Sequence, residues 1–222
     1  MKFFRRHFLI FISGVFALFA FGWSVFKKLQ QSSVTHEPGE NLPDDFVLPE
    51  EAKQIVHRSD GMIFRVDRNR KTACAFSEET GELIWESRGE ENFIVPGVAF
   101  PIDLSPDGEL WVANVGRKRL EQIDPKTGRF IASWEPQEPF GGCCNPVRFA
   151  ALSGGRFLTV EKGVRRICIY QPSGKLERVV SDELSQLEVN YYLHRVGNIV
   201  NIYDTGAKKH WEVSHDDAMA IS

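Results

Sequence analysis

The sequence predicts an all-β protein, a β-propeller of about four blades that is preceded by one transmembrane helix. Two kinds of turn support the propeller because they repeat in phase. A turn of sequence Asp-Gly or Gly-Gly recurs every 47 residues, at positions 60–61, 107–108 and 154–155. A second turn, Thr-Gly or Ser-Gly, keeps the same phase at positions 80–81, 127–128 and 173–174. Short strands and turns with a period near 45 residues are typical of propeller blades.

Between the turns lie short runs of β-branched, aromatic and aliphatic residues, which predict four strands in each complete repeat. In the second repeat the predicted strands lie at 102–104, 110–114, 119–124 and 130–134. The glycine of each turn tolerates the positive φ that a tight hairpin needs. A β-sandwich also has regularly spaced strands, but it does not require the same turn chemistry at a 47-residue interval.

The predicted repeats cover residues 51–90, 91–138, 139–183 and 184–222. The last repeat is shortened, with strands predicted at 189–193, 199–203 and 210–213 and no evident fourth strand. The missing strand can come from residues 45–50 or from the tail after Asp217. Otherwise the repeats form an open arc, or a second copy of the chain completes the propeller by self-association.

An apolar segment near the N-terminus predicts a membrane anchor. Residues 8–26 contain no charge, and as a helix they extend about 28 Å, enough to cross a hydrocarbon core. Residues 1–7 are a basic stub, which the positive-inside rule places in the cytoplasm, so the bulk of the chain is periplasmic or extracellular on a single-pass inner-membrane protein. A cleaved signal peptide is the alternative, but no small-x-small site follows cleanly. Residues 27–50 contain three prolines and predict an extended linker.

The charge distribution excludes some partners. After residue 28 the chain contains 22 basic and 30 acidic residues and therefore has a net charge of −8. An acidic domain without a basic stripe argues against nucleic acid and against docking on anionic lipid.

Four short motifs resemble a known family. Phe-Ile-Val-Pro at 93–96 precedes Leu-Trp-Val-Ala-Asn-Val-Gly-Arg at 110–117, Gly-Cys-Cys-Asn-Pro at 142–146 and Thr-Val-Glu-Lys-Gly at 159–163. Over residues 50–183 this pattern resembles NHL-repeat-like bacterial β-propeller proteins with a Gly-Cys-Cys-Asn-Pro signature. The resemblance implies an exported or membrane-anchored propeller. This chain departs from such relatives by its shorter end, because they are longer and have more blades.

The adjacent cysteines Cys143 and Cys144 allow three interpretations. A disulfide between cysteines adjacent in sequence is strained and easily reduced, so the pair can form a rigid, redox-sensitive turn between two blades. The pair can also be two free thiols, or ligands of a metal or cluster, although the spacing differs from the C-x-x-C pattern of zinc sites. Cys74 and Cys168 lie in predicted third strands and are expected to be small core residues.

Oxygen-bearing side chains follow the second strand of successive blades. Asp67, Asn114 and Glu161 stand at equivalent positions, so their loops share one face and the side chains can converge on the central channel. Carboxylate and amide oxygens from separate blades suit Ca²⁺, although no cofactor is required by the sequence. Alternatively these residues cap their own turns, with Glu161 and Lys162 as a solvated pair.

Basic residues begin the third strand of each of the first three blades, at 70–71, 117–119 and 165–166. They can form a positive collar for an acidic ligand or partner, and Arg117 of this collar is a candidate binding residue. Lys162, beside Glu161, is a further candidate binding residue. The collar residues can equally be solubilising charges that discourage aggregation of the strands. Trp85 and Trp134 occupy equivalent outer positions and are expected to pack between the sheets.

The sequence therefore favours a binding or scaffold module for a protein or small ligand. The alternative is a metal-dependent hydrolase of the lactonase type, built on Asp67, Asn114 and Glu161. The sequence contains no nucleophile elbow, phosphate loop or dinucleotide fingerprint, and its histidines lack zinc spacing. These observations make an enzyme the less favoured of the two.

Overall fold

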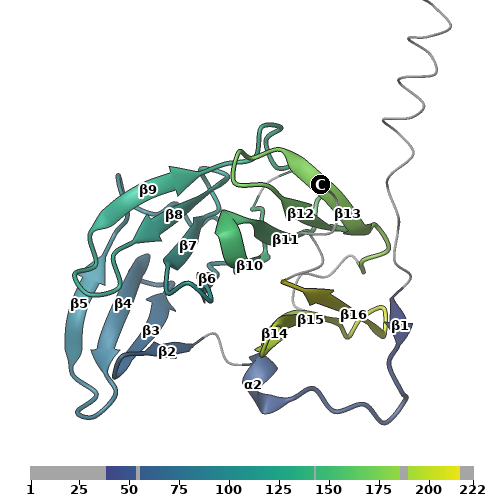
Figure 1. The fold of residues 1–222 in the computed structure, drawn as a ribbon, viewed down its shortest axis with the longest axis horizontal. Coiled ribbons are helices and arrows are strands. Elements are labelled where there is room, and N and C mark those ends of the chain that lie inside the picture. Colours follow the sequence, from purple (N-terminus) through teal and green to yellow (C-terminus); the bar gives the residue numbers. More distant parts are fainter. Residues whose placement is uncertain (1–38, 54–55, 143, 186–189, 216–222) are drawn as a thin grey trace, which may run out of the picture. The chain divides into compact units, whose positions relative to one another are not determined.

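The computed structural model describes residues 39–215 apart from residues 54–55, 143 and 186–189. These residues form four antiparallel sheets of four strands, which follow one another along the chain as blades of a propeller (Figure 1). The predicted all-β propeller with four blades is confirmed. The predicted anchor at 8–26 and the tail after residue 215 lie outside the described residues. In the described part of the chain, no helix is long and apolar enough to span a membrane.

The first three blades are each built from four consecutive strands, with the first strand innermost (Figure 1). Blade 1 contains β2 (His57–Ser59), β3 (Met62–Asp67), β4 (Thr72–Ser77) and β5 (Leu83–Ser87). Blade 2 contains β6 (Ile102–Leu104), β7 (Leu110–Asn114), β8 (Arg119–Ile123) and β9 (Phe130–Trp134). Blade 3 contains β10 (Arg148–Ala151), the 3₁₀ turn η1 (Ser153–Gly155), β11 (Phe157–Glu161), β12 (Arg166–Tyr170) and β13 (Leu176–Ser181).

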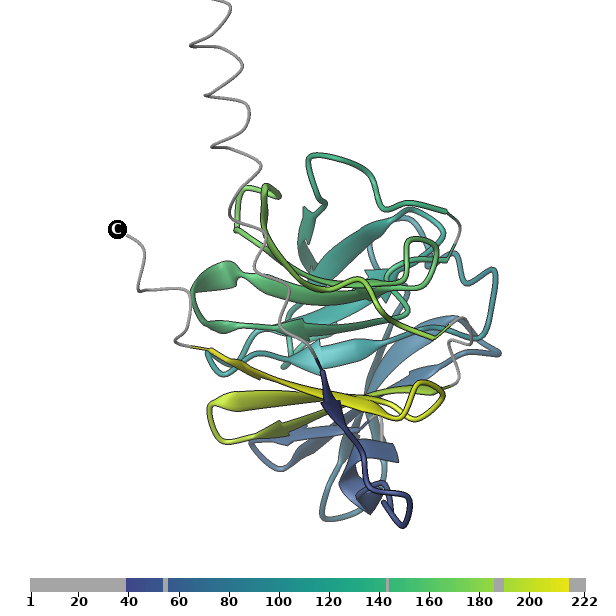
Figure 2. The same ribbon diagram turned by 90° about the vertical axis from the view of Figure 1, so that its right-hand side faces the viewer.

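Blade 4 takes its outer strand from the other end of the propeller domain. It contains β14 (Tyr191–Val196), β15 (Ile199–Asp204) and β16 (Lys209–Ser214). The short strand β1 (Glu40–Asn41) pairs antiparallel with β16, and the two strands are next to each other in Figures 1 and 2. The donor is therefore residues 40–41 and not the predicted 45–50, which lead instead into the helix α2 (Glu50–Lys53). Gly39 permits this approach, because a Cβ there would lie 2.5 Å from Cε2 of Trp211.

Apolar cores join each blade to the next. The core between blades 1 and 2 includes Phe64, Trp85, Phe100, Leu110 and Ile123. The core between blades 2 and 3 includes Trp111, Trp134, Phe140, Phe157 and Tyr170. The core between blades 3 and 4 includes Val160, Ile169, Tyr191, Val200 and Trp211. Among the described residues, no hydrophobic cluster of this kind joins blade 4 to blade 1.

The two equivalent tryptophans do pack between blades, as predicted. Trp85 and Trp134 are 8% and 7% exposed. Each indole N–H donates to a backbone carbonyl in the following blade, from Trp85 to Pro125 at 2.9 Å and from Trp134 to Gln171 at 3.4 Å. A buried indole needs such a partner, so these hydrogen bonds fix how each outer strand meets the next blade.

The outward faces of the two end blades are finished in different ways. On blade 1, Arg65 stands at the register position that Val112, Thr159 and Ile202 occupy in the other blades, where all three are buried. On blade 4, residues 42–53 supply a cover. Phe46 stacks on Tyr203 with ring centroids 5.4 Å apart, and α2 contacts β14. A polar residue on one end and a cover on the other keep the terminal repeats of such an array soluble.

A polar cluster at the centre connects the inner strands of all four blades. Oδ2 of Asp103 in β6 accepts hydrogen bonds from the backbone N–H of Ala151 in β10, at 2.7 Å, and from Nη2 of Arg195 in β14, at 2.8 Å. Nε2 of His57 in β2 lies 3.0 Å from the carbonyl oxygen of Ile102 and 3.5 Å from Oδ1 of Asp103. We call this cluster of His57, Asp103, Ala151 and Arg195 the hub.

Replacing Asp103 with alanine is expected to lower the free energy of unfolding by about 3 kcal/mol, because the Arg195 guanidinium loses its carboxylate partner and the backbone N–H of Ala151 loses its acceptor. Arg195→Met in the same background should restore part of this loss by removing the unpaired charge. Chemical denaturation of the full chain measures both effects. Glu79→Ala, which removes an exposed carboxylate, is the control and should change little. Additive effects of the two hub substitutions would contradict the proposed coupling.

Candidate functional site

The predicted loop residues occupy one register level of the propeller. Asp67, Asn114 and Glu161 are the last residues of β3, β7 and β11, and each pairs with the first residue of the following strand. Asp204 holds the same position at the end of β15, opposite Lys209. The 47-residue period does not predict Asp204 at this level, because the interval to the fourth blade is shorter than 47 residues.

Two of these four side chains cap their own turns. Oδ1 of Asp67 accepts the backbone N–H of Arg70 at 2.9 Å. Oδ1 of Asp204 accepts the backbone N–H groups of Gly206 and Ala207, each at 3.0 Å, and the hydroxyl of Ser185 at 2.7 Å. This is the turn-capping role that the sequence offered as an alternative to a shared cation site.

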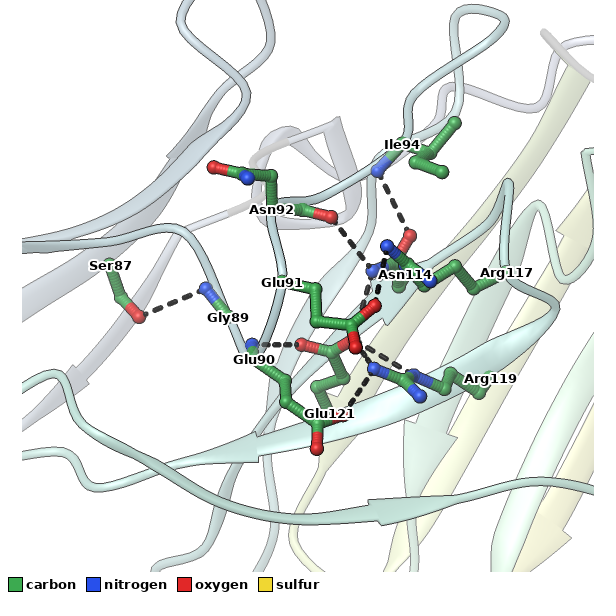
Figure 3. A network of polar contacts seen from close by, with 10 residues as sticks. All are labelled: Ser87, Gly89, Glu90, Glu91, Asn92, Ile94, Asn114, Arg117, Arg119 and Glu121. Carbon is green, nitrogen blue, oxygen red and sulfur yellow. Dashed lines mark hydrogen bonds and ion pairs between the residues drawn. The ribbon is translucent and has the colours of Figure 1, made fainter.

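Asn114 fastens the incoming loop of blade 2. Its side-chain oxygen accepts the backbone N–H of Ile94 at 2.9 Å, and its amide nitrogen donates to Glu121 at 2.8 Å (Figure 3). The backbone N–H of Gly116 donates to the carbonyl of Ile94 at 2.9 Å. A side chain at Gly116 would collide with Ile94, so the close approach of the two loops requires glycine at this position.

Glu121 lies at the centre of this network and has no exposed surface. Its carboxylate accepts hydrogen bonds from Nε of Arg119, at 2.9 Å, and from the backbone N–H of Glu90, at 3.0 Å (Figure 3). Burial acts to lower the pKa of Arg119, but its bonds to the Glu121 and Glu90 carboxylates outweigh burial and raise that pKa. The charge of Arg119 therefore persists in the folded protein, and its pairing with Glu121 offsets part of the cost of burying the two groups.

Blade 3 buries a second carboxylate with a different set of donors. Glu161 is also fully buried. It accepts the hydroxyls of Thr159 and Tyr170, at 2.9 and 2.8 Å, and Nε of Arg166, at 3.0 Å. Burial, reinforced by the Glu161 charge, raises the pKa of Tyr170, so the phenol remains a donor. Glu161 is therefore not the solvated partner of Lys162 that one interpretation expected.

These contacts decide what the predicted oxygen set can do. Asp67, Asn114 and Glu161 each accept hydrogen bonds from donors in their own blade or its incoming loop. Among the described residues, no three side chains of His, Cys, Asp or Glu are grouped so that they can hold a metal ion. The geometry thus gives these three residues an architectural role and lends no support to a calcium site built from them.

The predicted basic collar is largely paired with acidic side chains. Arg70 lies 2.5 Å from Glu86, and Arg117 lies 2.8 Å from Glu91. Arg166 pairs with the buried Glu161. Exposed pairs of this kind contribute little to stability, but they cancel the positive potential that a continuous collar would need.

The loop that carries the cysteine pair docks on the turn of blade 3. Oδ1 of the buried Asn145 accepts the backbone N–H of Lys162 at 3.0 Å, so Lys162 takes part through its backbone. Cys144 has a positive φ of 60°, and a Cβ on Gly97 would lie 3.6 Å from its sulfur. The loops that enter blades 2 and 3 therefore meet at Cys144. Cys143 lies outside the described residues, so the disulfide, dithiol and metal interpretations remain predictions.

No protein-family model matches the chain, and no curated protein matches it. Several solved structures are similar to it in fold. The WD40 propeller domain of Doa1 is 15% identical, with 73% of this chain and 50% of that chain covered and a TM-score of 0.48. An inactive virginiamycin B lyase from Staphylococcus aureus is also 15% identical, with 72% and 51% covered and a TM-score of 0.47. BamB from Moraxella catarrhalis is 12% identical, with 81% and 51% covered and a TM-score of 0.40.

The chain thus spans about half the length of the solved propellers that it matches. Identities this low and TM-scores below 0.5 carry no information about activity or partners.

The chain contains four cysteines, and the two in strands are buried free thiols, Cys74 and Cys168. Burial raises the pKa of both, so they stay protonated at pH 8 and react slowly. If Cys143 and Cys144 form a disulfide, a thiol titration of the native full-length protein is expected to detect no rapidly reacting thiol before mild reduction and two rapidly reacting thiols after it.

The variant Cys143→Ser/Cys144→Ser is the matched control and should show no rapid thiol in either state. Two rapid thiols before reduction would instead identify a dithiol. Titration after unfolding in reductant should reveal all four.

Proposed function

We propose that this chain is a membrane-anchored, extracytoplasmic β-propeller that acts as a binding or scaffold module for a protein or small ligand. The propeller fold, with surface loops carried on rigid blades, supports the proposal because such loops can vary without disturbing the sheets. The resemblance to NHL-repeat-like propeller proteins points the same way.

One observation carries the choice of a binding module over a hydrolase. Of the four residues at the level where a reactive centre was predicted, Asn114, Glu161 and Asp204 are buried and hydrogen-bonded, and the half-buried Asp67 caps its own turn. Glu121, Glu161 and Asp204 have no exposed surface, and each carboxylate accepts two or more hydrogen bonds from its own blade or the loop that enters it. Groups that are buried and saturated in this way hold loops in place and do not meet a substrate.

The anchor rests on the sequence alone. Residues 8–26 are uncharged and long enough to cross a bilayer, and Lys2, Arg5 and Arg6 precede them. A polar linker at 27–50 would then hold the propeller away from the membrane surface, and part of it supplies β1 and the cover of blade 4.

Alkaline carbonate extraction of membranes that contain the full-length chain is expected to leave it in the membrane pellet. Introducing a charge at the centre of the apolar segment, as in Leu18→Lys, should shift the chain toward the soluble fraction, because a central lysine costs about 3 kcal/mol. Leu18→Ile is the matched control. A C-terminal alkaline phosphatase fusion should be active; an inactive phosphatase would place the propeller in the cytoplasm.

The melting temperature of the full-length chain is expected to be the same with and without Ca²⁺, because the candidate oxygens are already bonded. A ligand that binds only the folded state must raise the melting temperature. A rise with Ca²⁺ that Asp67→Asn and Glu161→Gln abolish would instead favour the hydrolase. Glu79→Gln serves as the control for a general effect of acidic residues.

A further inference from the structure

The outward face of blade 1 forms a hollow of about 490 Å³. Strands β3, β4 and β5 and the turn after β3 line it; they lie in the blade at the left of Figure 1. The lining side chains that matter here are Arg65, Asp67, Arg68, Arg70, Phe76 and Leu83. Arg70 pairs with Glu86, so the two remaining arginines against Asp67 leave this hollow basic on an otherwise acidic domain.

The hollow exists because this face has no preceding blade among the described residues. In blades 2, 3 and 4 the position of Phe76 is taken by Ile123, Tyr170 and Val213, which are all buried against the blade before them. In blade 1 the same face keeps Phe76 half-buried and adds the exposed Arg65. The face that packs against the preceding blade in blades 2, 3 and 4 therefore carries an aromatic and a cationic side chain at its surface in blade 1.

Arg65 is held in an orientation that suits an oxyanion. Its guanidinium carbon lies 4.1 Å from the centroid of the Phe76 ring. Stacking occupies the flat face of the guanidinium and leaves the N–H donors at its edge. Those donors match the two oxygens of a carboxylate, and the stacked group has already lost part of its conformational freedom.

Arg68 supplies a second cation from the adjoining turn. It donates to the carbonyl oxygen of Val98 at 3.3 Å, and within the described part of the chain neither Arg65 nor Arg68 forms an ion pair. Arg70 is different, because it lies 2.5 Å from Glu86, and Asp67 accepts the backbone N–H of Arg70. The hollow therefore contains two arginines outside any ion pair of the described residues, against the single carboxylate of Asp67, and keeps a net positive charge.

An apolar edge adjoins these cations. Strand β5 is the outermost strand of blade 1, so one side of its backbone has no partner within the sheet. Leu83 and Ile84 at its start are 50% and 48% exposed. An edge strand with exposed aliphatic side chains is suited to a peptide in extended conformation, which pairs with the backbone and places alternate side chains on the surface.

We propose that the hollow of blade 1 binds an extended acidic segment of a partner protein. Its carboxylates would meet Arg65 and Arg68, and its apolar side chains would contact Leu83 and Phe76. This inference rests on the proposed function as a binding module and names the chemistry of the partner. Charge complementarity and the unpaired edge of β5 select a segment of this kind.

The test is fluorescence anisotropy with the full-length protein and a labelled decapeptide of alternating Glu and Val residues. Saturable binding is expected, and Arg65→Gln/Arg68→Gln should weaken it at least about tenfold, as the loss of charge-assisted hydrogen bonds implies. Arg65→Lys should give an intermediate loss, because it keeps the charge but not the planar fork. Arg129→Gln, an exposed arginine of blade 2, is the matched control. All these arginines are exposed, so the melting temperatures should be unchanged.

Four results would overturn the proposal. The decapeptide binds the double variant as tightly as the unaltered chain, or a Gln-Val decapeptide binds as well as the Glu-Val one. Alternatively, citrate binds with the same dependence on Arg65 and the decapeptide does not, which assigns the hollow to small anions. Self-association that the double variant abolishes would assign it to a second copy of the chain. Each result leaves the carbonate extraction and phosphatase outcomes untouched, so failure here is separable from failure of the proposed function.

Discussion

The carboxylate of Asp103 is the contact on which the arrangement of the blades depends. Each blade is a separate sheet, and apolar cores pack one blade on the next without specifying how the inner strands meet. Asp103 joins β6 to the backbone of β10 and to Arg195 of β14, and it lies beside His57 of β2. A directional, charge-assisted cluster at this point sets the positions that non-directional packing leaves open.

The same principle operates at the loop level, where buried carboxylates fasten loops to strands. Glu121 holds the backbone of the loop that enters blade 2, and Asp204 holds Ser185 in the loop that enters blade 4. Glu161 instead binds donors within its own sheet. A carboxylate without exposure must find such donors, because an unpaired buried charge is costly. These buried carboxylates thus hold strands and loops of the propeller in fixed positions. A rigid scaffold of this kind suits a protein that presents surfaces to partners.

The two ends of the array differ in how their outward faces are finished. Blade 4 is covered by the chain itself, through Phe46 and α2. Blade 1 has no such cover among the described residues, and its face combines a stacked arginine with exposed leucine. Because its outward face is uncovered, blade 1 is the end of the array at which a partner can bind.

The sequence by itself determined the repeat, the strands and the register, because turn chemistry and strand periodicity are local properties. Asp60-Gly61 and its copies predicted blades, and Asp67, Asn114 and Glu161 fell at one level. Tertiary structure alone decided their roles, because Arg166 and Tyr170, which donate to Glu161, lie on the neighbouring strand, and the loop that Asn114 fastens lies in another part of the sequence. Glu121 and Asp103 gave no sequence signal, since an isolated acid in an alternating strand looks like a surface residue. Strand β1 could not be predicted from the sequence either, because a two-residue strand has no periodicity and only its pairing with β16 defines it.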